Sequence, residues 1–206
     1  MTARLILVTG FEPFVGHAVN PSEDLAKALD GRVFGGATVR AAVLPVHHLE
    51  AAARAAALVD ELHPDAVVHF GLAGGRARVA LERVAVNVMD FDVPDNAGYR
   101  ARGEVCESAG PAAYLATLPL GPMLDALLGR GIPAYLSSTA GTYLCNRTMY
   151  ATLHLAATRG LGMRAGFVHL PLLPSMVAAT GVDAPSMDFA LMLEAAETAL
   201  AVVAAS

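Results

Sequence analysis

Short apolar runs alternate with amphipathic stretches along most of this chain of 206 residues. Most of the apolar runs are short and rich in valine and alanine, and glycine or proline closes several of them, as is typical of buried strands. We expect strands in RLILVT (4–9), ATVRAAVLPV (37–46), DAVVHFG (65–71), IPAYLSS (132–138) and RAGFVHLPL (164–172). The alternating stretch RVALERVAVNVMDF (78–91) predicts one or two more strands.

The stretches between these runs have helical spacing and helix-capping residues. We expect helices over 20–31, 48–62, 115–128 and 186–205, and one from the end of IPAYLSS to about 158. Asn20 or Ser22 should cap the first and Ser186 the last. The helix over 115–128 should be broken near Gly121 and Pro122. Strands that alternate with helices predict an α/β fold, a three-layer α/β/α domain with a mainly parallel twisted sheet. We expect residues 1–206 to form one domain, with its ligand site at the carboxyl ends of the strands.

The composition narrows the class of protein. Hydrophobic residues make up 55% of the chain and charged residues 16%, which favours a compact folded protein over a disordered one. The net charge is −5 and Lys27 is the single lysine, so we expect no nucleic-acid partner. We also expect no signal peptide and no membrane span, and therefore a cytoplasmic protein with reduced cysteines.

Cys145 is the first candidate for chemistry. It lies in SSTAGTYLCNRTMY, between a predicted strand and a predicted helix. The thiol there is either packing material, since free cysteine is often buried, or a nucleophile whose thiolate is favoured by the start of a helix. We expect the other cysteine, Cys106, to be structural.

A nucleophilic cysteine needs a base and a group that orients the base. His169 ends an apolar strand, where residues that face a ligand emerge, and Glu82 is a carboxylate in an apolar run that needs a partner if it is buried. Either residue also has an ordinary structural explanation, and His69, at another strand end, is a rival for His169. No spacing of histidines and carboxylates suggests a metal site, and the common dinucleotide, phosphate-loop and metalloprotease signatures are missing.

Taken together, several segments resemble one family, the pyroglutamyl peptidases of type I, also called pyrrolidone-carboxylate peptidases. The segments follow the family's order and span most of the chain: VTGFEPFVGHAVNPSE, GLAGGRARVALERVAVNVMD, VPDNAG, GPAAYLATLP, SSTAGTYLCNRTMY and GFVHLPLLP. The family consists of cysteine peptidases that remove an N-terminal pyroglutamyl residue from peptides.

The resemblance implies roles for individual residues. It makes Cys145 the nucleophile, His169 the base and Glu82 the third member of the triad. It places the substrate-binding pocket at Phe11, Phe14, Leu72, Val93 and Tyr143. It also implies peptides with an N-terminal pyroglutamate as substrates, no metal or other cofactor, and a homotetramer.

The chain departs from the usual family pattern at four positions, namely Val15, Leu72, Tyr143 and Asp92. Asp92 stands where many members have an arginine near the nucleophile. Its carboxylate would either disfavour the thiolate by repulsion or lie in solvent, paired with an arginine such as Arg100. The alternatives to a peptidase are a degenerate member that binds blocked peptides without cutting them, and a small-molecule binding protein with an inert cysteine.

Overall fold

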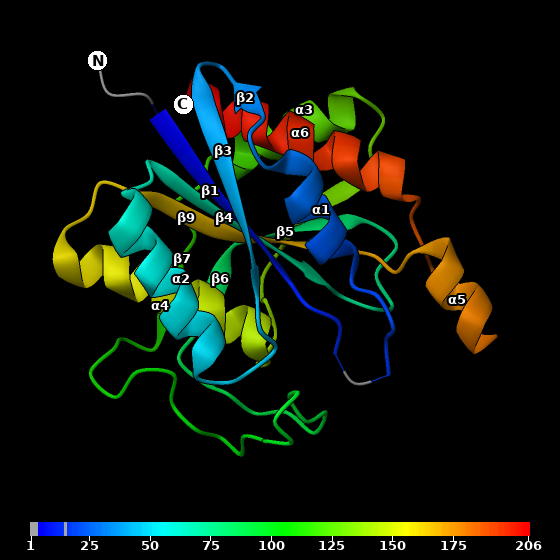
Figure 1. Ribbon diagram of the computed structural model, residues 1–206, viewed down its shortest axis with the longest axis horizontal. Helices are drawn as coiled ribbons and strands as arrows, with labels where there is room; N and C mark the ends of the chain where they lie inside the picture. Colours follow the sequence, from blue (N-terminus) through cyan, green and yellow to red (C-terminus); the bar gives the residue numbers. More distant parts are fainter. Residues whose placement is uncertain (1–3, 15) are drawn as a thin grey trace.

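The computed structural model describes residues 4–14 and 16–206, and its centre is a mixed, mainly parallel sheet (Figure 1). The strands of this sheet lie in the order β2-β3-β1-β4-β9-β5-β8. Their bounds are β1 (Arg4–Phe11), β2 (Val33–Phe34), β3 (Ala37–Leu44), β4 (Ala66–Leu72), β5 (Val79–Glu82), β8 (Ala134–Ser137) and β9 (Arg164–Leu170). A second, two-stranded sheet pairs β6 (Val84–Val86) with β7 (Ala113–Leu115).

Most neighbouring strands of the main sheet run parallel. The parallel pairs are β1 with β3 and with β4, β4 with β9, and β5 with β8. The antiparallel pairs are β2 with β3 and β5 with β9. The reversal at β9 and β5 places Ala80 opposite His169 and Glu82 opposite Phe167.

Helices cover both faces of the sheet and produce the three layers that the sequence predicts (Figure 1). α1, α3 and α6 pack on one face, whereas α2 and α4 pack on the other. The bounds are α1 (Pro21–Leu29), α2 (Glu50–Leu62), α3 (Leu120–Gly129), α4 (Leu144–Arg159), α5 (Pro174–Thr180) and α6 (Phe189–Ala205). Among the described residues, no helix combines the length and the apolar character that crossing a membrane requires.

The alternation of side chains along β9 explains why each face has its own core. Val168 and Leu170 pack with α1, α3 and α6, whereas Phe167 packs with α2 and α4. His169 lies two residues after Phe167, so it shares the face that α2 and α4 cover. Polar groups of this strand end are therefore directed toward α4.

Three details of the predicted helices were wrong. The helix predicted over 115–128 begins at Leu120, because Ala113–Leu115 form β7. Gly121 and Pro122 do not break α3, because Pro122 lies in its first turn, where a backbone N–H has no partner within the helix. Ser186 does not cap the last helix; Asp188 does, and its side chain accepts a hydrogen bond from the Ala190 N–H at 2.8 Å. The capping of α1 by Asn20 is confirmed, with its side chain accepting from the Ser22 N–H.

Candidate active site

Glu82 and His169 form a buried pair between β5 and β9. The Glu82 Oε1 atom lies 2.7 Å from the Nδ1 atom of His169, and both side chains are almost fully inaccessible to solvent. Ala80 pairs directly with His169, and Glu82 is two residues further along the same face of β5. A diagonal contact of this kind lies within reach of two long side chains.

Cys145 reaches the same face of the sheet from α4, which belongs to the helix layer that covers this face. It is the second residue of α4, so its thiol lies in the first turn, where the helix presents unpaired N–H groups. Gly71 pairs with His169 in the parallel register of β4 and β9. A Cβ atom at Gly71 would lie 3.1 Å from the Cys145 Sγ atom and 2.7 Å from the Phe167 ring. The sulfur therefore lies over the glycine, next to the strand position that His169 occupies.

Within the described residues, no hydrogen bond joins the Cys145 Sγ atom to His169. Catalytic hydrogen bonds are often long before substrate binds. The arrangement thus supplies a thiol, an imidazole and a carboxylate on one face, with the carboxylate already bound to one ring nitrogen.

The electrostatics of this site favour a neutral thiol and a neutral imidazole at rest. Burial raises the pKa of Cys145 to about 12, and the charge of Glu82 acts in the same direction. Burial lowers the pKa of His169 more than the hydrogen bond and charge of Glu82 raise it. Burial alone would raise the pKa of Glu82, but the hydrogen bonds and charge of His169 and the hydrogen bond from Arg76 outweigh it and lower the pKa, so the carboxylate stays ionised.

An apolar pocket opens beside Cys145. It is lined by Phe11, Phe14, Asn20, Val46, Leu72, Tyr143, Leu144 and Cys145. The structure thus brings four of the five predicted pocket residues together around the candidate nucleophile. Val46 and Leu144 also line the pocket and were not predicted, since their only signals are their places just after β3 and just before Cys145. Asn20 was considered as a helix cap alone.

Val93, the fifth predicted pocket residue, is not part of this lining. Its side chain is half exposed on the loop that follows β6. The next residue, Pro94, accepts a hydrogen bond at its carbonyl oxygen from the Tyr143 hydroxyl at 3.1 Å. The hydroxyl of Tyr143 is therefore engaged by the protein, and a contact of Val93 with substrate stays a prediction. Val15 lies outside the described residues.

Asp92 lies in solvent and is paired with an arginine, but the partner is Arg102. The Asp92 Oδ1 atom is 2.6 Å from an Arg102 nitrogen, and its side chain is 85% exposed. Arg100, the arginine named above as an example, donates instead to the backbone oxygen of Asp92. The side-chain charges that shift the pKa of Cys145 are those of Glu82 and Arg76.

We therefore expect the Asp92→Asn variant to leave the reactivity of the thiol unchanged, since water and Arg102 screen the carboxylate. The measurement is the rate of Cys145 alkylation by iodoacetamide as a function of pH. The wild-type and variant profiles should superimpose. A displacement of the variant profile to lower pH would show that Asp92 repels the thiolate after all.

His69, the alternative to His169 as the base, has the contacts of a residue with a structural role. It is fully buried in β4, with Nδ1 2.7 Å from the Thr9 hydroxyl and Nε2 3.0 Å from the Thr152 hydroxyl. Both ring nitrogens are thus engaged by neutral groups. Burial lowers the pKa of His69 to about 3, so the ring stays neutral in the folded protein.

This buried neutral histidine predicts acid sensitivity. Between the unfolded pKa of about 6.5 and the folded pKa of about 3, the unfolded chain binds a proton that the folded chain does not, so stability falls as pH falls. Between pH 7 and pH 5 this one group should lower the free energy of unfolding by about 2 kcal/mol. In urea unfolding, His69→Gln should lack this part of the pH dependence. An unchanged pH dependence in the variant would contradict the assignment.

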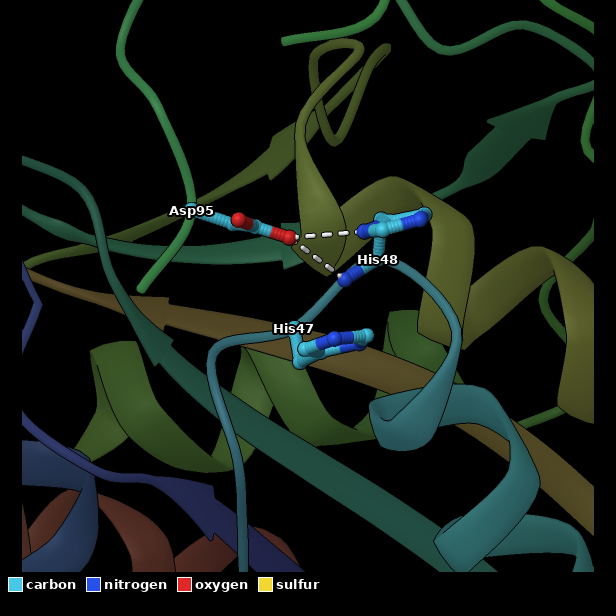
Figure 2. Close-up of side chains that lie close together, drawn as sticks. All are labelled: His47, His48 and Asp95. Atoms are coloured by element: carbon cyan, nitrogen blue, oxygen red, sulfur yellow. Dashed lines mark hydrogen bonds and ion pairs between the residues drawn. The ribbon is translucent and has the colours of Figure 1, made fainter. Parts of the chain in front are cut away.

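A second group of ionisable side chains, His47, His48 and Asp95, comes together from the loops that follow β3 and β6 (Figure 2). Asp95 is buried, and its Oδ2 atom accepts from the His48 N–H at 2.9 Å and lies 2.8 Å from His48 Nδ1. Its Oδ1 atom accepts from the N–H groups of Ala97 and Tyr99. The His47 ring stacks on that of His48, with centroids 4.7 Å apart. These contacts anchor the loop that follows β6. One possible ligand atom from each of the three residues lies within 4.8 Å of the others, an arrangement that the spacing in the sequence did not suggest.

The fold and the site together define a class of protein. A thiol at the start of a helix, beside a histidine and carboxylate pair and an apolar pocket, is typical of the active site of a cysteine hydrolase with an α/β fold.

Comparison with known proteins identifies the family. The model of the pyroglutamyl peptidase family matches residues 4–206. The chain is 43% identical over 200 residues to the pyrrolidone-carboxylate peptidase of Pyrococcus furiosus, covering 96% of each chain. It is 45% identical over 197 residues to that of Klebsiella pneumoniae, covering 96% of this chain and 91% of the other. A solved structure of a mutant P. furiosus pyrrolidone carboxyl peptidase matches with a TM-score of 0.94 and 42% identity over 97% of each chain. The chain therefore belongs to the pyroglutamyl peptidase family and is a hydrolase of that type.

Proposed function

We propose that this protein hydrolyses the bond after an N-terminal pyroglutamyl residue of peptides, with Cys145 as the nucleophile, His169 as the general base and Glu82 as the residue that orients the base. One observation carries the proposal. The register of β4, β9 and β5 gathers the Cys145 sulfur, the His169 ring and the Glu82 carboxylate on one face of the sheet.

The contact between Glu82 and His169 assigns the role of each ring nitrogen. An ionised carboxylate accepts a hydrogen bond, so Nδ1 carries the proton and Nε2 is left as the acceptor. Nε2 takes the thiol proton as the sulfur attacks the carbonyl carbon that links pyroglutamate to the next residue. Because thiol and imidazole are both neutral at rest, proton transfer accompanies the attack, and Glu82 stabilises the imidazolium that forms.

The later steps use the same residues. The N–H groups in the first turn of α4 lie beside the Cys145 sulfur. From there they can donate to the carbonyl oxygen of the bond under attack, on which negative charge develops. The protonated His169 then donates its proton to the leaving amine as the carbon–nitrogen bond breaks, which leaves a thioester on Cys145. Water, deprotonated by His169, attacks the thioester, and pyroglutamate leaves as the thiol takes back its proton.

The pocket fits the proposed substrate group. A pyroglutamyl residue is a neutral lactam without a free amine, so it favours apolar walls over a carboxylate that would bind an amino terminus. Phe11, Phe14, Leu72 and Tyr143 supply such walls beside the sulfur. The names of the relatives, pyrrolidone-carboxylate peptidases, agree with this substrate class.

Four further features rest on the resemblance to the family or on composition, and we carry them as part of the proposal. They are a single catalytic domain over 1–206, action without a cofactor, a homotetrameric assembly and a cytoplasmic location. Size-exclusion chromatography with light scattering tests the assembly directly.

The reaction is tested by the release of a chromogenic amine from three amides. The wild-type enzyme should cleave the pyroglutamyl amide and leave the prolyl amide, whose ring carries a charged amine, and the open glutamyl amide uncut. Binding of the pyroglutamyl amide without release of the amine would instead identify a degenerate member of the family. Equal cleavage of all three would contradict the lactam pocket.

A further inference from the structure

Arg76 joins the buried pair of Glu82 and His169 from a loop that the reaction scheme leaves without a role. The loop follows β4, and one guanidinium nitrogen of Arg76 lies 2.5 Å from Glu82 Oε1, the oxygen that also lies 2.7 Å from His169 Nδ1. The Arg76 side chain is 25% exposed, whereas that of Glu82 is fully buried. Two donors thus converge on a single carboxylate oxygen at the base of the site.

We propose that Arg76 is a positioning residue for the reaction, which holds Glu82 in place and in its charged form and thereby keeps His169 free to accept the proton of Cys145. This inference rests on the proposed function, because it assigns Arg76 a part in the same proton transfer. It adds Arg76 as a fourth side chain to the site formed by Cys145, His169 and Glu82.

The charges explain what such a residue does. An isolated carboxylate at this position would favour a protonated His169 and oppose a thiolate at Cys145. The positive charge of Arg76 opposes the influence of Glu82 on both groups, and it lowers the pKa of His169 and of Cys145. A His169 ring that is neutral at rest can accept a proton, whereas a ring already charged by Glu82 cannot.

The other titratable or hydrogen-bonding groups packed here do not supply this positive charge. β8 contributes the neutral Ser137 hydroxyl, which donates to the Thr139 carbonyl oxygen at 3.1 Å, and β4 contributes His69, which burial keeps neutral. The start of α4 contributes Tyr143, whose pKa burial raises to about 12. Among these groups, Arg76 alone opposes the negative charge of Glu82.

The loop provides a matched control for a test. Arg78 lies two residues further along, and its guanidinium lies 4.5 Å from the centre of the Tyr135 ring. Arg76→Met and Arg78→Met remove the same charge from the same loop, and Arg76→Lys keeps the charge while losing the planar fork of donors.

The experiment measures, for each variant, kcat/KM against pH and the rate of Cys145 alkylation against pH. In Arg76→Met the acidic limb of kcat/KM, which reports His169, should move up by about one pH unit, and the alkylation profile should move up by a similar amount. Arg76→Lys should recover most of both shifts, and Arg78→Met should follow the wild type.

A uniform loss of activity in Arg76→Met with unmoved profiles would show a packing role only and overturn the proposal, as would unchanged activity. If Arg76→Met does not fold, the pair of Arg76→Lys and Arg76→Gln provides the same comparison of charge. Alkylation needs no turnover, so an enzyme that fails to cleave pyroglutamyl amides would refute the proposed function, while the alkylation profiles would still decide the role of Arg76.

Discussion

Replacing Cys145 by alanine is expected to lower kcat/KM for a pyroglutamyl amide by at least about 10³-fold, since the variant has no atom that can form the thioester. The fold should survive, because the change removes one sulfur atom at the partly exposed start of α4. The measurement is the release of amine by purified protein, with circular dichroism to confirm folding.

Cys106→Ala is the control for this variant. Cys106 is buried, its pKa is raised to about 11 by burial, and its thiol lies 3.7 Å from the Val86 carbonyl oxygen as a weak donor. Folded Cys106→Ala should keep wild-type activity within about threefold. Activity of Cys145→Ala within about tenfold of the wild type, a loss below about 1.4 kcal/mol of barrier stabilisation, would refute the nucleophile assignment.

His169→Ala is expected to be nearly as damaging, because it removes the group that accepts the thiol proton and protonates the leaving amine. Glu82→Gln should cost less, since a residue that orients a base contributes less than the base, although the neutral amide disturbs the ring and leaves Arg76 without its counter-charge. We expect losses of about 10³-fold for His169→Ala and about 10²-fold for Glu82→Gln, measured as kcat/KM.

His69→Gln separates the two histidines at strand ends. It should lower stability but leave the activity of the folded fraction within about tenfold, because, within the part of the chain that the structure describes, the His69 ring nitrogens bond to Thr9 and Thr152 and not to Cys145 or Glu82. A variant of His69 that is folded and inactive, beside an active His169→Ala, would show that the base was assigned to the wrong strand.

Much of the fold could be predicted from the sequence, because buried parallel strands and their covering helices leave a strong periodic signal. The apolar runs at β1, β4 and β9 mark the middle of the sheet. The short elements β2, β7 and α5 have no such signal, since a few residues with exposed side chains carry too little pattern. Pro122 misled the prediction because the same residue breaks a helix in its interior and is accepted in its first turn.

The site shows a similar division. Cys145, His169 and Glu82 could be named from their positions at strand and helix ends, but their proximity depends on the register of β9 against β4 and β5, which the sequence does not display. Arg76 had no signal at all, because a loop arginine is ordinarily a solvated charge. Its contact with Glu82 depends on how the loop after β4 returns toward β5.

The most direct test of the account is to map the covalent adduct of an affinity label, the chloromethyl ketone of pyroglutamate, by peptide mass spectrometry. Activity should be lost in proportion to labelling, the label should be on Cys145 alone, and free 2-pyrrolidone should slow the reaction by occupying the pocket. Inactivation that leaves Cys145 unlabelled, with the adduct on Cys106 or another residue, would contradict the account.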